Sequence, residues 1–477
     1  MNRCARSRTC LSALVVASAL MLVATAASAQ ANPPEPQTSK AEPQTPAPAQ
    51  APPQATAPAE IPPSAARQFP APPSVMVGPT REIKLAENTW FRFGAQVQAW
   101  FKLAQDPIRQ SDGSDGGYAN DFYCRRCRLF VTGSVVKDVT FNILLEASSF
   151  GKADPATGVK TFGAPSLLDA YAQVKFADPF SLSAGSILLP LTRNGTQPTT
   201  TYLSIDNANV DVTPVLQGNS TVIRDVGVMA NGFFLADHLE YHLGIFQGSR
   251  APAVTSTPAT TPPTVIRSAS HNLPRFVDAL QYNLWDTEKG YVNGGHYYGT
   301  KKVLGVVASA DYQGLGKDDP PKPGTDKDPY VGFSAATFIN YPLSGAGDPK
   351  KGGDELVGLL QFGYYDGGGA TPPNLATYSR VLRQINLLAE GAYYNRDMKF
   401  SIFGKFEMRK IQPHLYSDPQ KAANNVTWYA AGVKYYIAPA NLCNIGLQYE
   451  RTQFPDALAT QQSGTNNVTV QMQLLLY

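Results

Sequence analysis

The chain has 477 residues, enough for one large domain or for two to three ordinary ones. Its 40 basic and 37 acidic residues give a formal charge of +3 at pH 7, but three of the arginines lie in the first 29 residues, which contain no acid. Without that segment the chain is formally neutral, which excludes a globally basic, nucleic-acid-binding surface. Any preference for anions must therefore come from where individual charges sit.

The first 29 residues have the composition of a secretory signal peptide. Arg3, Arg6 and Arg8 precede an apolar run that ends in Ala-Ser-Ala at Ala29. A basic start, a short apolar run and small residues before the cleavage point are typical of such a signal, whereas a membrane anchor needs a longer run. We expect cleavage after Ala29 and export of the remaining chain.

Residues 30–80 are dominated by proline, alanine, glutamine and threonine. This composition cannot bury a hydrophobic core and favours extended polyproline II conformations. We predict a disordered periplasmic tether that is placed to contact the cell wall. The folded domain is expected over residues 81–477.

From residue 90 onward, apolar and polar side chains alternate in short runs. In residues 90–102 the odd positions are phenylalanine, alanine and valine, while the even positions include Arg92, Gln96 and Gln98. A period of two residues puts these sets on opposite faces of a β-strand. The alternation recurs in residues 139–148, 168–176, 239–246 and 467–477, the last of which ends the chain on a tyrosine.

The connections between these runs alternate in length. Short ones, such as VKDV and NRDM, alternate with long polar ones, although the connections near 285–301 and 342–353 are longer than this rule expects. Short turns on one side and long loops on the other are typical of outer-membrane barrels. We predict an all-β, transmembrane antiparallel β-barrel of about 16 strands in the bacterial outer membrane. A soluble sandwich would share the alternation but not the signal or the loop pattern.

Two cysteines stand around two arginines in DFYCRRCRLFVTGSV, residues 121–135. On a regular strand, which rises about 3.3 Å per residue, Cys124 and Cys127 would point to opposite faces with their Cα atoms about 10 Å apart. A disulfide needs at most about 7 Å, and Cys443 alone cannot complete a zinc site, so we expect neither. An irregular backbone over residues 121–126 would make a local disulfide feasible again.

The same alternation places Arg126 and Arg128 on the lumen face. The rigid guanidinium fork matches the oxygens of phosphate and carboxylate groups, so paired arginines in a pore would raise the local concentration of anions. They would also be satisfied by pairing with Asp169 or Glu146 on neighbouring strands. Both interpretations stay open from the sequence.

Five stretches follow in order: RRCRLFVTGSV, LLDAYAQVKF, LSAGSILLPLTR, RDVGVMANG and LGIFQG. Together, over about residues 122–248, they resemble the phosphate-selective porin O and P family of bacterial outer membranes. The resemblance implies a trimeric barrel whose third long loop, here residues 190–222, folds inward to form a constriction. It also implies that Arg126 and Arg128 form the paired arginines of the wall and that Arg224 opens the strand after the loop.

Some residues depart from that family pattern. Leu188 stands where the family commonly has a lysine, and the third loop carries Asp206 and Asp211 beside Arg193. Acids on the loop facing arginines on the wall would make a transverse field, as in general diffusion porins. We expect passive diffusion of small hydrophilic solutes with a preference for anions. The predicted solute-binding residues are Arg126, Arg128, Arg224, Arg193, Asp206 and Asp211.

Other classes of function find less support. His238, Glu240 and His242 share one strand face at about 6.6 Å spacing, which suits either a surface metal site or a polar lumen face. The five histidines have no recognisable catalytic setting and there is no G-x-S-x-G motif, so we expect no enzyme, metal or cofactor. The alternative is a non-conducting barrel that acts as an adhesin or scaffold. Expected partners are outer-membrane lipid, lipopolysaccharide, small anions and two further copies of the chain.

Overall fold

The computed structural model describes residues 82–154, 157–212, 223–248, 254–255, 265–266, 273–290, 292–314, 329–343, 352–367, 381–415, 417–438 and 441–476. The described residues all belong to one compact unit, Phe69–Tyr477. The predicted signal peptide, residues 1–29, and the predicted tether, residues 30–80, lie outside them.

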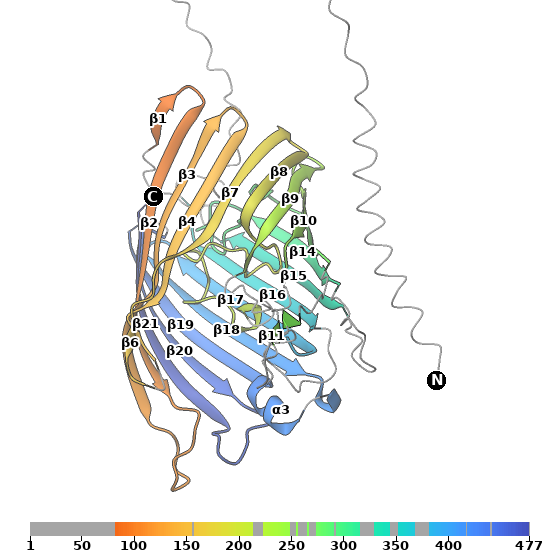
Figure 1. Ribbon diagram of the computed structural model, residues 1–477. Coiled ribbons are helices and arrows are strands. Elements are labelled where there is room, and N and C mark those ends of the chain that lie inside the picture. Colours follow the sequence, from red (N-terminus) through yellow and green to blue (C-terminus); the bar gives the residue numbers. More distant parts are fainter. Residues whose placement is uncertain are drawn as a thin grey trace, which may run out of the picture. The chain divides into compact units, whose positions relative to one another are not determined.

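Sixteen strands of the described chain form an antiparallel sheet that closes on itself (Figure 1). Each strand pairs with the next along the chain, and the last returns to the first, with Leu476 opposite Ala95. The closed sheet confirms the predicted all-β barrel of about 16 strands. Its strands are β2 (Thr89–Gln105), β3 (Tyr118–Val136), β4 (Val139–Phe150), β7 (Ser166–Ala177), β8 (Phe180–Leu188), β9 (Arg224–Phe234), β10 (Leu239–Phe246), β13 (Arg275–Asn283), β14 (Val303–Gln313), β15 (Tyr330–Pro342), β16 (Glu355–Asp366), β17 (Gln384–Asn395), β18 (Phe400–Ile411), β19 (Val426–Ala438), β20 (Cys443–Gln453) and β21 (Gly464–Leu476).

A few short elements lie beyond these sixteen strands. β1 (Ile83–Ala86) pairs with the start of β2. No helix among the described residues is both long and apolar enough to cross a membrane, and the longest has seven residues. The remaining short elements are β5 (Lys152–Ala153), β6 (Lys160–Thr161), β11 (Val254–Thr255), β12 (Val265–Ile266), α2 (Asn209–Val212), η3 (Pro413–Leu415) and α3 (Asp418–Asn424).

The two faces of the sheet have reversed polarity compared with a soluble protein. On β2, the apolar side chains of Phe93 and Val97 are 59% and 41% exposed, whereas Gln96 and Gln98 are buried. An apolar outer face and a polar interior are the arrangement that lets a barrel sit in lipid around a polar lumen. This reversal excludes the soluble sandwich, in which the apolar face would be buried.

Short turns and longer connections alternate around the barrel, as the sequence predicted. The connections after β3, β7, β9, β17 and β19 have two to four residues. The two exceptions also hold, because residues 284–302 separate β13 from β14 and residues 343–354 separate β15 from β16. Since the strands are antiparallel and in chain order, both lie at the end of the barrel that carries the short turns.

Two connecting segments enter the barrel. The first, here called the inner loop, is residues 189–212 after β8. Its backbone N–H groups at Ser204 and Ile205 donate to Glu390 of β17 and Gln448 of β20, and its Thr199 carbonyl accepts from Gln98 of β2. Side chains from strands far apart in the chain thus hold one segment, which places the inner loop inside the barrel.

The second segment, the inner turn, comprises residues 284–302, of which 291 is not described. It meets the inner loop in an apolar cluster inside the barrel. Ala208 and Val210 of the loop and Tyr297 and Tyr298 of the turn pack with wall residues that include Phe338, Leu359, Leu388 and Tyr436. Burial of these side chains favours keeping both segments in place.

Candidate solute-selective site

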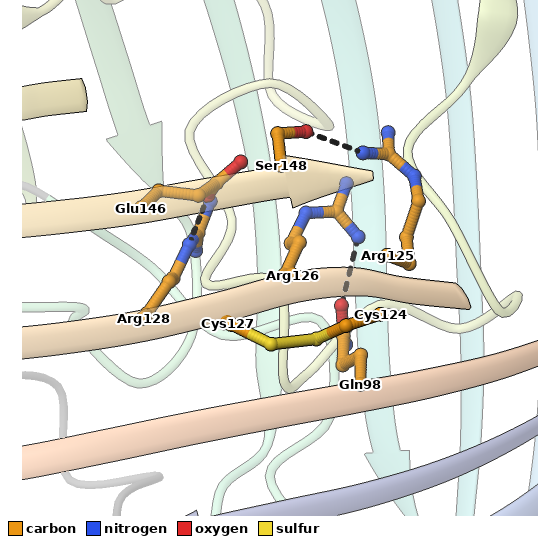
Figure 2. Close-up of a disulfide and its surroundings, with 8 residues drawn as sticks. All are labelled: Gln98, Cys124, Arg125, Arg126, Cys127, Arg128, Glu146 and Ser148. Atoms are coloured by element: carbon orange, nitrogen blue, oxygen red, sulfur yellow. Dashed lines mark hydrogen bonds and ion pairs between the residues drawn. A yellow bond between two sulfur atoms is a disulfide. The ribbon is translucent and has the colours of Figure 1, made fainter. Parts of the chain in front are cut away.

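A disulfide joins Cys124 and Cys127, so the prediction that these cysteines face opposite sides is wrong. Their Cα atoms are 6.2 Å apart rather than about 10 Å. The cause is a β-bulge, since Gln98 of β2 pairs with Arg126 while the next residue, Ala99, pairs with Cys124. Arg125 is the extra residue of the bulge, which resets the alternation along β3 and brings both cysteines to one face (Figure 2).

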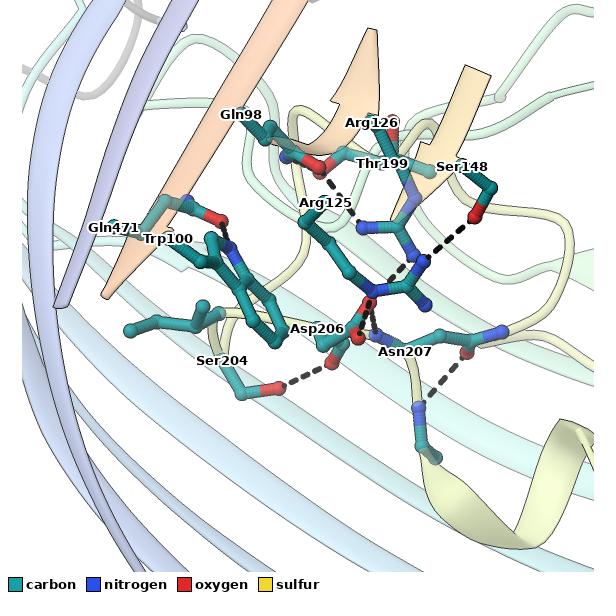
Figure 3. Close-up of polar contacts among 12 residues, drawn as sticks. Gln98, Trp100, Arg125, Arg126, Ser148, Thr199, Ser204, Asp206, Asn207 and Gln471 are labelled. Carbon is teal, nitrogen blue, oxygen red and sulfur yellow. Dashed lines mark hydrogen bonds and ion pairs between the residues drawn. The ribbon is translucent and has the colours of Figure 1, made fainter. Parts of the chain in front are cut away.

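The bulge also brings a third arginine into the lumen. Arg125 Nε donates to Asp206 Oδ2 at 3.0 Å, and Arg126 Nη2 donates to Asp206 Oδ1 at 2.5 Å (Figure 3). Arg126 also donates to Gln98 Oε1 at 2.9 Å. Regular alternation put Arg125 on the opposite face from Arg126, so sequence reasoning missed it. The predicted lumen position of Arg126 agrees with its contacts.

Asp206 comes from the inner loop and ties it to the wall. Burial opposes ionisation of this carboxyl, but the guanidinium groups of Arg125 and Arg126 outweigh that effect and hold the pKa of Asp206 below its usual range. The side chains of Arg125 and Asp206 each keep 23% exposure, whereas that of Arg126 keeps 6%. The exposed edge of the cluster therefore carries one arginine and the carboxylate.

The other two wall arginines have carboxylate partners on nearby strands, one strand away for Arg128 and two strands away for Arg224. Arg128 pairs with Glu146 of β4 and donates to Thr199 Oγ1 of the inner loop at 2.8 Å. Arg224, the first residue of β9 as expected, donates from Nε to Asp169 Oδ1 at 2.7 Å. The pairing alternative left open by the sequence is thus observed for Arg128, whereas Arg126 binds Asp206 and Asp169 binds Arg224.

Arg125, Arg126, Arg128 and Arg224, together with Asp206, Glu146 and Asp169, form what we call the arginine cluster. Four guanidinium groups face three carboxylates, which leaves one positive charge in excess. Ionised Arg and carboxylate groups at such distances form the stronger class of hydrogen bonds. The cluster is therefore a rigid wall with a small positive excess.

The structure places Arg193 and Asp211 apart from this cluster. Arg193 is only 2% exposed and donates to both carboxylate oxygens of Glu288 on the inner turn, at 2.9 and 2.7 Å. Its guanidinium carbon lies 3.7 Å from the ring centroid of Phe338. Asp211 accepts from Gln361 Nε2 at 2.6 Å on the opposite wall. Both residues lie in the protein interior, where their contacts hold the inner loop in place.

The inner turn is anchored by a second buried carboxylate. Glu355 of β16 accepts hydrogen bonds from the backbone N–H groups of Tyr297 and Tyr298, at 3.0 and 2.9 Å, and lies 3.1 Å from His296 Nδ1. The turn also donates to the loop, from Gly295 N to Thr201 Oγ1 at 3.0 Å. In the sequence, the only sign of this inward segment was the unexpected length of the connection.

The three residues considered as a metal site do not converge. His242 Nε2 lies 3.0 Å from Glu240 Oε1, while His238 Nδ1 lies 2.6 Å from the backbone oxygen of Asn283. Within the described ranges, no group of three or more His, Cys, Asp or Glu side chains is arranged to hold a metal ion. Glu240 and His242 belong to the polar lining of β10, and His238 lies in the turn before it.

A comparison with known protein families finds a match over the segment that contains the arginine cluster. Residues 98–234 match the model of the family described as phosphate-selective porin O and P, which confirms the resemblance seen in the sequence. The matched residues include the bulged strand, the inner loop and Arg224. No curated protein matches the chain.

Three solved structures are similar to the chain at low identity. OmpF of Salmonella typhi, in complex with daunomycin, is 13% identical with a TM-score of 0.49, over 83% of this chain and 100% of its own. The outer membrane channel DcaP of Acinetobacter baumannii is 10% identical with a TM-score of 0.48, over 83% and 99%. OmpT of Vibrio cholerae is 10% identical with a TM-score of 0.42, over 83% and 100%.

Proposed function

From the match of residues 98–234 to the phosphate-selective porin O and P family, and from the closed barrel, we propose that this chain is an outer-membrane porin. It allows passive diffusion of small hydrophilic solutes and favours anions such as phosphate and similar oxyanions. Barrel and family point to a channel rather than an enzyme. The proposal includes export by the signal peptide of residues 1–29, a tether over residues 30–80, contact with outer-membrane lipid and lipopolysaccharide, and assembly as a homotrimer.

The observation that carries the anion preference is the excess of guanidinium groups in the arginine cluster. Arg125, Arg126, Arg128 and Arg224 meet three carboxylates, and the most exposed arginine, Arg125, shares its carboxylate with Arg126. A guanidinium whose partner is shared keeps donors for a passing oxyanion. Electrostatic selection at a constriction needs only a small net charge because the surrounding protein has a low dielectric constant.

One observation favours a second candidate, a barrel that does not conduct and acts as an adhesin or scaffold. The inner loop and the inner turn bury the inward side chains of several strands, as the alternating burial of β15, β16 and β17 shows. On the side of β4 and β7, however, inward residues such as Asn142 and Gln173 stay partly exposed. An unfilled side of this kind supports the channel over the blocked barrel.

Planar-bilayer recording distinguishes the two candidates. We expect the refolded mature chain to conduct, with a reversal potential in a salt gradient that indicates anion selectivity and a current that added phosphate reduces. The double variant Arg126→Ser/Arg128→Ser leaves two guanidinium groups facing three carboxylates, so its selectivity should invert toward cations. Lys137→Ser, which changes an exposed lysine in the turn after β3, is the matched control and should keep the wild-type selectivity.

Each other result has a clear meaning. Absence of current from well-folded protein would favour the adhesin or scaffold barrel. Current whose selectivity is the same in wild type and in the double variant would contradict the arginine cluster as the selective site. Current without phosphate block would make the chain a general anion-favouring porin.

A further inference from the structure

The bulge on β3 makes two consecutive residues face the same side of the sheet. On a regular strand Arg125 and Arg126 would point in opposite directions, yet both bond to the single carboxylate of Asp206, at 3.0 and 2.5 Å. Two residues of the bulged strand oppose one residue of the partner, here Gln98. Arg125 also donates to Oγ of Ser148 on the neighbouring strand β4, at 3.2 Å.

The cysteines that flank the bulge lie on the outer face. Cys127 pairs with Val97 and Cys124 with Ala99, and Val97 is one of the exposed apolar side chains of the outer face. The disulfide therefore closes a ring of four residues on the outside while the two enclosed arginines point inside (Figure 2). Without the extra residue, Cys124 and Cys127 would be too far apart to join.

Hydrogen bonds alone hold an extra residue only weakly at one position of a strand. If it moves along the strand by one position, one side chain changes from the lumen face to the lipid face. On β4, Ser149 opposite the bulge has a left-handed backbone with φ of 53°, so both strands adapt to the irregularity at this position. The covalent link between Cys124 and Cys127 spans the irregularity at Arg125.

We propose that the Cys124–Cys127 disulfide is a positioning device that holds Arg125 in the lumen, where Arg125 is a specificity-determining residue of the channel. This inference rests on the proposed porin function and adds to it the residue that provides the excess charge. Arg125 contacts the passing anion, and the two cysteines act only through its placement.

Selectivity measured on a small set of variants tests the proposal. Arg125→Ala should lower the anion-to-cation permeability ratio by about threefold, the effect expected of one unit charge beside a water-filled pore. Cys124→Ala/Cys127→Ala should lower it by a similar factor, and the triple variant should show no additional loss. Arg125→Lys keeps the charge and should retain most of the ratio.

Cys443→Ala is the control, because Cys443 is the free cysteine among the described residues. It should leave the ratio unchanged. If the double cysteine variant does not fold, the folded wild-type protein is reduced with a phosphine, the free thiols are verified by mass after alkylation of a sample, and the ratio is measured in the reductant. The same decrease is expected.

Two results would overturn the inference while leaving the porin function intact. An unchanged ratio after loss or reduction of the disulfide, with a decrease in Arg125→Ala, would show that the bulge holds without the bond. An unchanged ratio in Arg125→Ala would show that Arg125 does not select ions. A wild-type protein that carries no current would instead contradict the proposed function itself.

Discussion

The two sides of the barrel lumen are built differently. Around β14 to β18 the inward side chains are buried by the inner loop and the inner turn, and the ion pairs there, such as Arg193–Glu288, connect these segments to each other. Around β3, β4 and β7 the wall carries most of the arginine cluster, and inward residues such as Ser148 and Asn142 retain exposure. One side is thus packed like a protein core, and the other can hold water and solutes.

Charge has a different role on each side. In the packed side, a carboxylate and a guanidinium with almost no exposure neutralise each other, and losing either one leaves a buried charge without a partner. In the arginine cluster, partial exposure and a shared carboxylate leave donors available to the lumen. The location of a charged residue in the barrel, rather than its type, therefore decides whether it holds the fold or selects a solute.

The largest expected effect comes from breaking the packed side. Glu288→Ala leaves the Arg193 guanidinium buried without its partner, which costs about 3–5 kcal/mol in typical buried pairs. The inner turn should undock, so the unit conductance should increase and the unfolding midpoint should fall. Denaturant unfolding and single-channel recording measure the two effects.

The double variant Arg193→Leu/Glu288→Leu is the control for this change, since it removes both charges and leaves none unpaired. It should recover most of the lost stability. A Glu288→Ala protein with wild-type conductance and midpoint would contradict the role of the Arg193–Glu288 pair in holding the inner turn.

Chemical modification tests which side carries the permeation path. Ser148→Cys places a thiol on the exposed side near Arg125, and a small charged methanethiosulfonate reagent should reduce its current. Ser334→Cys, the same change on packed β15 where Ser334 is 4% exposed, should not respond. Single-channel current before and after the reagent is the measurement, and a response only in Ser334→Cys would reverse the assignment of the two sides.

The last and most gradual expected effect is a pH dependence of the packed side. Burial raises the pKa of Asp211 to about 7, and the nearby Glu407 and Glu390 add to this increase. Since an unfolded aspartate titrates near pH 4, the native state binds the proton more tightly, and stability should fall between about pH 4 and pH 7 by about 1 kcal/mol per pH unit. Asp211→Asn should reduce this slope in denaturant titrations.

Asp115→Asn serves as the control for the pH experiment, because the Asp115 carboxyl is exposed in the loop between β2 and β3. Its slope should equal that of the wild type. A wild-type slope in Asp211→Asn would show that another group is responsible for the pH dependence.

The sequence by itself determined the barrel, the number of strands and the lumen position of Arg126 and Arg128. These features follow from a period of two residues and from the lengths of connections, which are local properties of the chain. Pairing of Arg128 with Glu146 was open to sequence reasoning because the partners lie on neighbouring strands, whereas the Arg224–Asp169 pair, which spans β8, was not considered. The sequence showed that the connection before β14 is long, but not that it enters the barrel.

Only the tertiary structure decided the bulge, the disulfide and the contents of the lumen. One extra residue in a strand leaves no local pattern, so regular alternation separated Cys124 from Cys127 and hid Arg125. The partners Arg125 and Asp206 are 81 residues apart, and Arg193 and Glu288 are 95 apart. Such contacts exist only when the closed barrel brings loop, turn and wall together, because their geometry depends on packing across the lumen rather than on neighbours in the chain.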